Sequence, residues 1–121
     1  DKCLVSHAGL SSLQAQWATS DTIHHRELMM GGPFWEKGAA WTDQSPIVHA
    51  AKFRTPMLLS VGENDFRVPL NNTLEMYAVL QRMRVPAKLL VWPDENHWIL
   101  KGENSRVFYR EVHAWLARWL K

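Results

Sequence analysis

Three short apolar runs, each followed at once by turn-forming residues, constrain the fold of this 121-residue chain more than any other feature. They are KCLVSHAG at residues 2–9, TPMLLSVGE at 55–63 and AKLLVWPD at 87–94. Their apolar residues are nearly continuous and do not alternate with polar ones, a pattern typical of parallel strands that helices cover on both faces. The sequence therefore predicts a parallel β-sheet.

Two amphipathic segments follow the second and third runs. Residues 71–86 place apolar side chains at helical spacing and end at a proline, and residues 105–121 repeat the apolar pattern. Strands and helices that alternate with such short links indicate βαβ units with right-handed crossovers. Segment 10–54 is less regular, and we expect one or two helices and a loop insertion there. The predicted fold class is α/β, with parallel strands and flanking helices.

Composition argues against several classes of partner. The formal net charge is only +2 and both signs are mixed along the chain, so no nucleic acid partner is indicated. No run of about 18 apolar residues occurs, so we expect no membrane-spanning helix. The adjacent residues His24 and His25 point in different directions on a helix or strand, and no further ligand recurs at suitable spacing. We therefore expect neither a metal site nor a cofactor.

Two turns carry the residue types of an acid and histidine pair. GENDFRVP, residues 62–69, leaves the second predicted strand, and PDENHWIL, residues 93–100, leaves the third. Because functional groups gather at the carboxyl ends of parallel strands, we expect Asp65 and His97 on the same rim of the sheet. A carboxylate that orients an imidazole makes up two of the three parts of a nucleophilic triad.

The third part, a nucleophilic serine, is not found. On an α/β-hydrolase sheet it precedes the acid and lies in a G-x-S-x-G turn. No serine before Asp65 has these glycines, so the nucleophile is absent or lies upstream. A turn-capping aspartate and an ordinary loop histidine are the alternatives for Asp65 and His97. Glu63, Asp94 and Glu95, on the same turns, are expected to be solvated.

TPMLLSVGENDFRVP, VPAKLLVWPDENHWILK and ENSRVFYREVHAWLARWL together resemble the C-terminal end of the prolyl oligopeptidase family of serine peptidases, particularly bacterial dipeptidyl and acylaminoacyl peptidases. The resemblance extends over residues 1–121 and is weakest at 10–33. It implies that Asp65 and His97 are catalytic, and it departs from the family at Asn96, where glycine is usual. It also implies that the chain is the C-terminal part of an α/β-hydrolase domain, with the serine turn and a β-propeller upstream.

The resemblance implies further site residues. Arg67 would point into the site and bind a substrate carbonyl, and Val68 would form a wall of the specificity pocket. A salt-bridged surface arginine and a valine buried behind the turn are the alternatives. Phe34 and Trp35, between the first two strands, are candidates for lining a substrate pocket, in a loop where α/β-hydrolases commonly place specificity elements; core packing is their alternative. His7 is expected to be a packing or surface residue.

The leading hypothesis is a serine-type peptide hydrolase for which this chain supplies the acid and the histidine, so that the isolated chain is inactive. The resemblance alone favours peptides over esters; an esterase and a non-catalytic α/β module are the alternatives. The expected partners are a peptide substrate, the upstream part of the hydrolase domain and the propeller. A homo-oligomer is possible, and the compartment, the cytoplasm or the periplasm of a bacterium, stays open. The first strand would have an unpaired edge, so we expect the isolated chain to self-associate.

Overall fold

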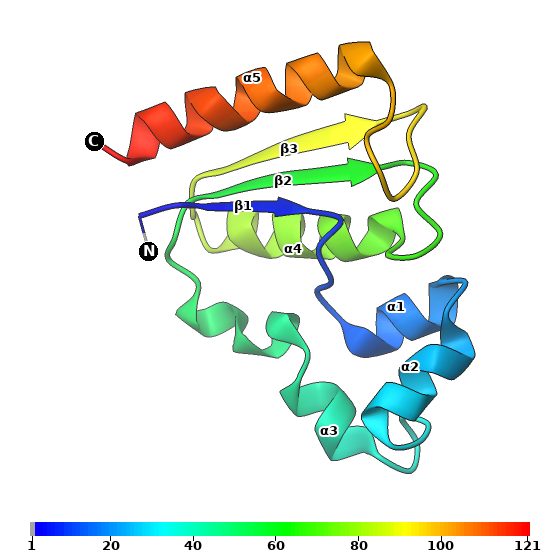
Figure 1. Cartoon of the computed structure of the whole chain (residues 1–121). Coiled ribbons are helices and arrows are strands. Elements are labelled where there is room, and N and C mark those ends of the chain that lie inside the picture. The colour runs from blue at the N-terminus through cyan, green and yellow to red at the C-terminus, as the bar shows by residue number, and fades with distance from the viewer. Residues whose placement is uncertain (1) are drawn as a thin grey trace.

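The structure is a computed structural model that describes residues 2–121, and its centre is a three-stranded parallel sheet (Figure 1). The strands are β1 (Leu4–His7), β2 (Met57–Gly62) and β3 (Ala87–Trp92), in the order β1-β2-β3. β2 pairs in parallel with both neighbours. The three apolar runs therefore form the predicted strands, and the α/β class is confirmed.

The central strand explains why its sequence is almost continuously apolar. Leu58, Ser60 and Val61 are fully buried, and Leu59 is 2% exposed. Successive side chains of a strand point to opposite faces, so both faces of β2 are covered. Among these four residues, Ser60 has the only polar side chain.

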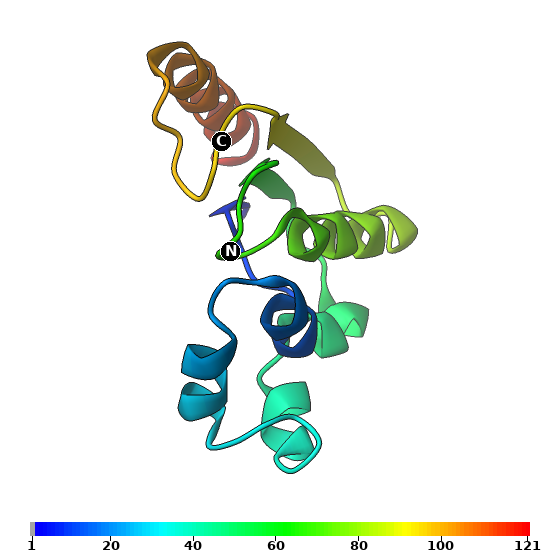
Figure 2. The same ribbon diagram turned by 90° about the vertical axis from the view of Figure 1, so that its right-hand side faces the viewer.

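Two long helices cover the two faces (Figures 1 and 2). On one face, α4 (Leu70–Arg82) packs Met76 and Leu80 against Leu59 in the main core cluster. On the other, α5 (Gly102–Trp119) buries Trp115. Both helices lie close to their predicted ranges.

Segment 10–54 contains more helices than expected. It forms α1 (Leu13–Thr19), α2 (Ile23–Met30), α3 (Gly38–Asp43) and the 3-10 helix η1 (Pro46–Lys52), which together lie beside the sheet (Figure 1). Each is too short to show a helical period clearly, so the expectation of one or two helices is wrong.

β1 forms one edge of the sheet. Its residues Leu4 and Val5 are 37% and 38% exposed, and β2 is its only strand partner within residues 2–121. The unpaired edge expected for the first strand is therefore present. No helix in this part of the chain combines the length and the apolar character needed to cross a membrane.

Candidate active site

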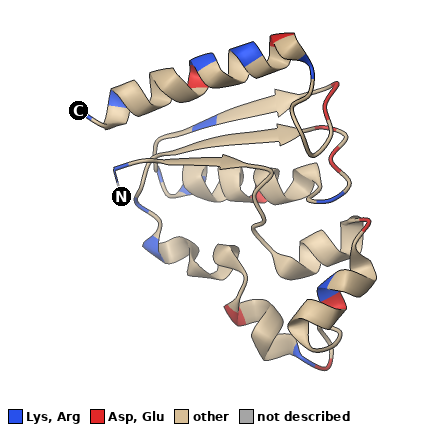
Figure 3. Cartoon of the chain, in the orientation of Figure 1, with Lys and Arg blue, Asp and Glu red and all other residues tan. Residues whose placement is uncertain are grey.

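The turns that leave β2 and β3 lie against each other at the carboxyl end of the sheet. The backbone N–H of Glu63 donates to the carbonyl of Trp92 (2.9 Å), and that of Asn64 donates to the carbonyl of Glu95 (3.0 Å). Acidic residues mark both turns in Figure 3. The two turns therefore lie on one rim of the sheet, as predicted from the strand order, and two backbone hydrogen bonds join them.

Asp65 and His97 are hydrogen-bonded across this rim. The Asp65 Oδ2 atom lies 2.8 Å from the Nδ1 atom of His97, and the Asp65 side chain is fully buried. Its other oxygen, Oδ1, accepts hydrogen bonds from the backbone N–H groups of Arg67 (2.9 Å) and Val68 (2.8 Å). Asp65 therefore caps its own turn with one oxygen and orients the imidazole with the other, so the two interpretations of this residue are not exclusive.

The hydrogen bond to Asp65 also determines what the rest of the His97 ring can do. A carboxylate oxygen accepts, so Nδ1 carries the proton and the neutral ring has its lone pair on Nε2. The His97 side chain is 34% exposed and lies beside an open cleft. A base with a free lone pair at a cleft can remove a proton from a bound group.

The cleft beside His97 has a volume of about 370 Å³ and two aromatic walls. Phe66 and Trp98 are each about two-thirds exposed, and the Trp98 ring lies edge-on to the His97 ring at 5.7 Å. The residues that line the cleft are Asp21, Asn64, Phe66, Arg67, Asn96, His97 and Trp98. Apolar and hydrogen-bonding surfaces therefore surround the imidazole.

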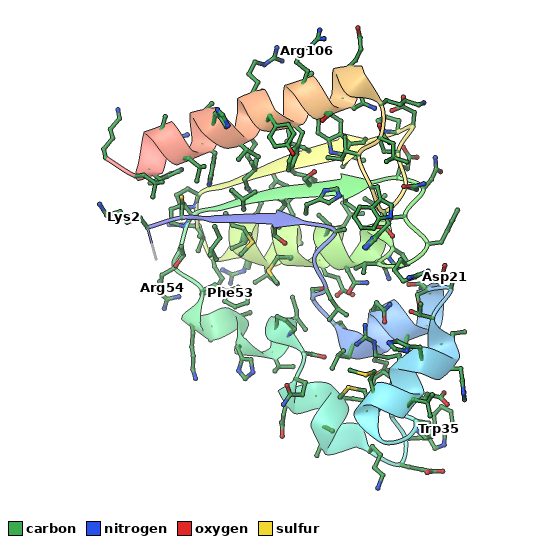
Figure 4. The ribbon with its side chains drawn as sticks, viewed as in Figure 1. Lys2, Asp21, Trp35, Phe53, Arg54 and Arg106 are labelled. Atoms are coloured by element: carbon green, nitrogen blue, oxygen red, sulfur yellow. The ribbon has the colours of Figure 1, made fainter. Side chains whose placement is uncertain are left out.

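Arg67 lines this cleft and is also paired with an acid. Its Nε atom donates to Asp21 Oδ1 (2.8 Å) and its Nη2 atom to Asp21 Oδ2 (3.4 Å). Asp21, labelled in Figure 4, belongs to the turn between α1 and α2. The hydrogen bond from Arg67 lowers the pKa of Asp21, and Asp21 raises the pKa of Arg67, so both groups are charged at neutral pH. Arg67 thus forms the salt bridge of the alternative interpretation and also lines the cleft beside His97, and its contact with substrate stays a prediction.

The remaining predicted site residues are less directly placed. Val68 donates its backbone N–H to Asp65, and its partly buried side chain is not among those lining the cleft. Phe34 and Trp35 pack around Trp17, with ring centroids 5.4 and 6.0 Å from it. Trp35, labelled in Figure 4, lies in the helical segment 10–54. The structure therefore does not bring these two aromatic residues to the His97 cleft, and their role in substrate binding stays a prediction.

Glu95 was expected to be solvated, and that expectation is wrong. It is only 4% exposed, and its carboxylate accepts from the backbone N–H groups of Leu100 (3.0 Å) and Lys101 (2.8 Å) and from the Asn104 amide (3.0 Å). The hydrogen bond from Leu100, with those from Asn104 and Lys101, lowers the pKa of Glu95. Glu95 therefore closes the loop that carries His97.

His7 is a second residue whose place the sequence did not indicate. It ends β1, and its ring bridges Ser60 on β2 and the backbone carbonyl of His97. Only its position at the carboxyl end of the strand next to β2 could have suggested a link to the site. Within residues 2–121, no three His, Cys, Asp or Glu side chains gather as a metal site would require.

Comparison with known proteins covers nearly the whole chain. The model of the prolyl oligopeptidase family matches residues 2–121. The chain is 36% identical to dipeptidyl-peptidase 5 of Porphyromonas gingivalis over 121 residues, which is 97% of this chain and 18% of that protein. It is 35% identical to dipeptidyl-peptidase 5 of Aspergillus oryzae over 121 residues, 98% of this chain and 16% of that protein.

A solved structure shares the fold. The acylaminoacyl peptidase of Pyrococcus horikoshii superimposes with a TM-score of 0.91 at 22% identity, over 98% of this chain and 20% of that one. The chain thus spans less than a fifth of the length of the two dipeptidyl-peptidases.

Proposed function

This chain belongs to the prolyl oligopeptidase family, and we propose that it supplies the acid and the histidine of a Ser-His-Asp triad in a serine-type peptide hydrolase. The observation that carries the proposal is the 2.8 Å hydrogen bond between the buried Asp65 and His97 at the edge of an open cleft. Aspartate and histidine in this chain order follow the order of an α/β-hydrolase, whose serine comes first. The serine of the proposal lies upstream of residue 1.

The proposed reaction gives the two nitrogens of His97 different tasks: Nε2 transfers the proton and Nδ1 stays hydrogen-bonded to Asp65. As the serine oxygen bonds to the substrate carbonyl carbon, His97 Nε2 takes its proton, and Asp65 stabilises the imidazolium through Nδ1. When the tetrahedral intermediate collapses, the same Nε2 proton passes to the leaving amine and the acyl-enzyme forms. Water then attacks the acyl-enzyme, with His97 as base and afterwards as acid, and the serine is restored.

Arg67 and the aromatic walls would hold the substrate. Arginine has five N–H donors, and Asp21 receives hydrogen bonds from two of the three side-chain nitrogens of Arg67. The remaining donors are available for a peptide carbonyl in the cleft, and the exposed rings of Phe66 and Trp98 offer apolar contact.

The proposal includes the rest of the domain. We place residues 1–121 at the C-terminal end of an α/β-hydrolase domain whose sheet continues beyond β1, and the exposed Leu4 and Val5 of that strand support this placement. The much greater length of the dipeptidyl-peptidase relatives leaves room for the upstream serine and for a propeller. A peptide is the proposed substrate of the whole protein.

A fluorophosphonate probe and two histidine variants of the complete gene product test the proposal. The unaltered protein is expected to be labelled on one serine and to hydrolyse peptides. His97→Ala is expected to lower kcat by about six decades, as loss of a triad histidine does, with little change in melting temperature. His113→Ala, at an exposed position of α5, is the matched control and is expected to keep full activity.

The outcomes separate the alternatives. A complete protein that the probe never labels, or a His97→Ala variant with normal turnover, would contradict the triad and favour the non-catalytic module. Hydrolysis of aryl esters without hydrolysis of any peptide would favour the esterase.

A further inference from the structure

The ring of His7 lies between the centre of the sheet and the backbone of His97. Its Nδ1 atom is 3.0 Å from the hydroxyl oxygen of Ser60, and its Nε2 atom is 3.1 Å from the carbonyl oxygen of His97. The Phe108 ring of α5 packs edge-on against it at 5.8 Å. Both ring nitrogens therefore have partners, and one of those partners belongs to the proposed catalytic histidine.

The donors and acceptors in this contact can be arranged in only one way for a neutral ring. The indole N–H of Trp92 donates to the Ser60 oxygen (2.8 Å), and the fully buried Ser60 hydroxyl then has its own hydrogen to donate to His7 Nδ1. That leaves the ring hydrogen on His7 Nε2, which donates to the His97 carbonyl. The opposite tautomer would set a lone pair against a carbonyl oxygen.

We propose that His7 is a positioning residue for His97. Asp65 holds the side chain of His97 through Nδ1, whereas His7 holds its backbone through the carbonyl oxygen, so that the residue is fixed at two points. The hydrogen-bonded chain Trp92, Ser60, His7 links that carbonyl to all three strands. The expected effect of His7 on turnover rests on the proposed function, but its effect on the structure of the loop that carries His97 does not.

Two substitutions at residue 7 separate the hydrogen bond to His97 from the packing of the ring. The side-chain amide of glutamine can reach the place of Nε2 and keep the donor to the His97 carbonyl. Asparagine reaches only the place of Nδ1, so it keeps a contact with Ser60 and loses the donor. His113→Asn, on the exposed surface of α5, controls for the change of residue type.

The experiment measures hydrogen exchange and turnover of the complete gene product. In His7→Asn, the amides of residues 94–101 are expected to exchange about tenfold faster, the factor expected from one lost hydrogen bond, and kcat is expected to fall by about the same factor with KM unchanged. His7→Gln is expected to stay within about threefold of the unaltered protein in both measurements. His113→Asn is expected to change neither.

Several outcomes would overturn the inference: unchanged exchange in His7→Asn, or equal effects of the asparagine and glutamine variants. Exchange is measured without substrate, so a complete protein that hydrolyses no peptide contradicts the proposed function and leaves the exchange result to decide about His7. If His7→Asn does not fold, Ser60→Ala tests the same series of hydrogen bonds at its middle member. It should also speed amide exchange in residues 94–101, and unchanged exchange there would overturn the inference.

Discussion

Replacing Gly62 by alanine is the most direct perturbation of the His97 loop without touching the acid or the histidine. A Cβ atom at residue 62 would lie 2.1 Å from the carbonyl oxygen of Asn96 and 2.5 Å from that of Glu95. Both are backbone atoms, so no side-chain rotation relieves the overlap. Ordinary contact begins at 3.4 Å, so the Asn96 carbonyl has to retreat by about 1.3 Å.

This shift is large on the scale of catalytic geometry. Asn96 precedes His97, so the imidazole is expected to move by about 1 Å, a misplacement that can cost about 100-fold in rate. We therefore expect kcat/KM of Gly62→Ala, measured on the complete gene product with a peptide substrate, to fall about 100-fold. The strain of overpacking adds a loss of stability of about 1–3 kcal/mol, visible as a lower melting temperature.

Gly102→Ala is the matched control for this experiment. Gly102 begins α5, and a Cβ atom there meets nothing within 4 Å. Alanine is also the better helix former, so this variant is expected to be fully active and at least as stable. If Gly62→Ala and Gly102→Ala have the same kcat/KM, the close approach of the two turns does not position His97, and the reasoning from this contact is refuted.

Two further variants test the acids around the site. The hydrogen bond from Leu100 lowers the pKa of Glu95 below 4.5 in the folded protein, so the stability that this gives is present above about pH 4.5 and is lost as the pH falls through the folded value. Glu95→Gln should have a lower melting temperature than the unaltered protein at pH 7, and the difference should be smaller at about pH 3. Glu63→Gln, at an exposed position, should match the melting temperature of the unaltered protein at both pH values. If the two variants show the same dependence of melting temperature on pH, this role of Glu95 is contradicted. Asp21→Ala frees Arg67 to leave the cleft, so KM for peptides should rise about tenfold with kcat unchanged, and an unchanged KM would exclude this role for Asp21.

The parts of the fold that could be predicted are those in which local pattern and burial agree. β2 is covered on both faces, so its apolar run carries the whole signal for a buried parallel strand. The helices of segment 10–54 are anchored by isolated residues such as Trp41, which is 2% exposed, and not by a long apolar stripe. Their number therefore depends on tertiary contacts that no local pattern records.

The same distinction applies to the site. The shared position of Asp65 and His97 on one rim was predictable because parallel pairing of β2 with β3 brings the turns after those strands together, whichever residues the turns carry. Glu95 and His7 were not, because their roles depend on the direction of one side chain and on how a loop closes over it. A buried loop-closing acid and a solvated turn acid have the same appearance in a sequence.

Many polar groups lie on the turns after β2 and β3 because several separate contacts are needed to hold His97 in one position. Asp65 fixes the ring of His97, and His7 fixes its carbonyl. Glu95 closes the following loop, and Gly62 sets how near that loop can approach β2. Each contact restrains a different degree of freedom, and a catalytic group must be held within about 0.5 Å of its working position. Loss of any one contact is therefore expected to lower turnover before it unfolds the domain, because the main core cluster contains none of these residues and consists of Leu59, Met76, Leu80 and Val85.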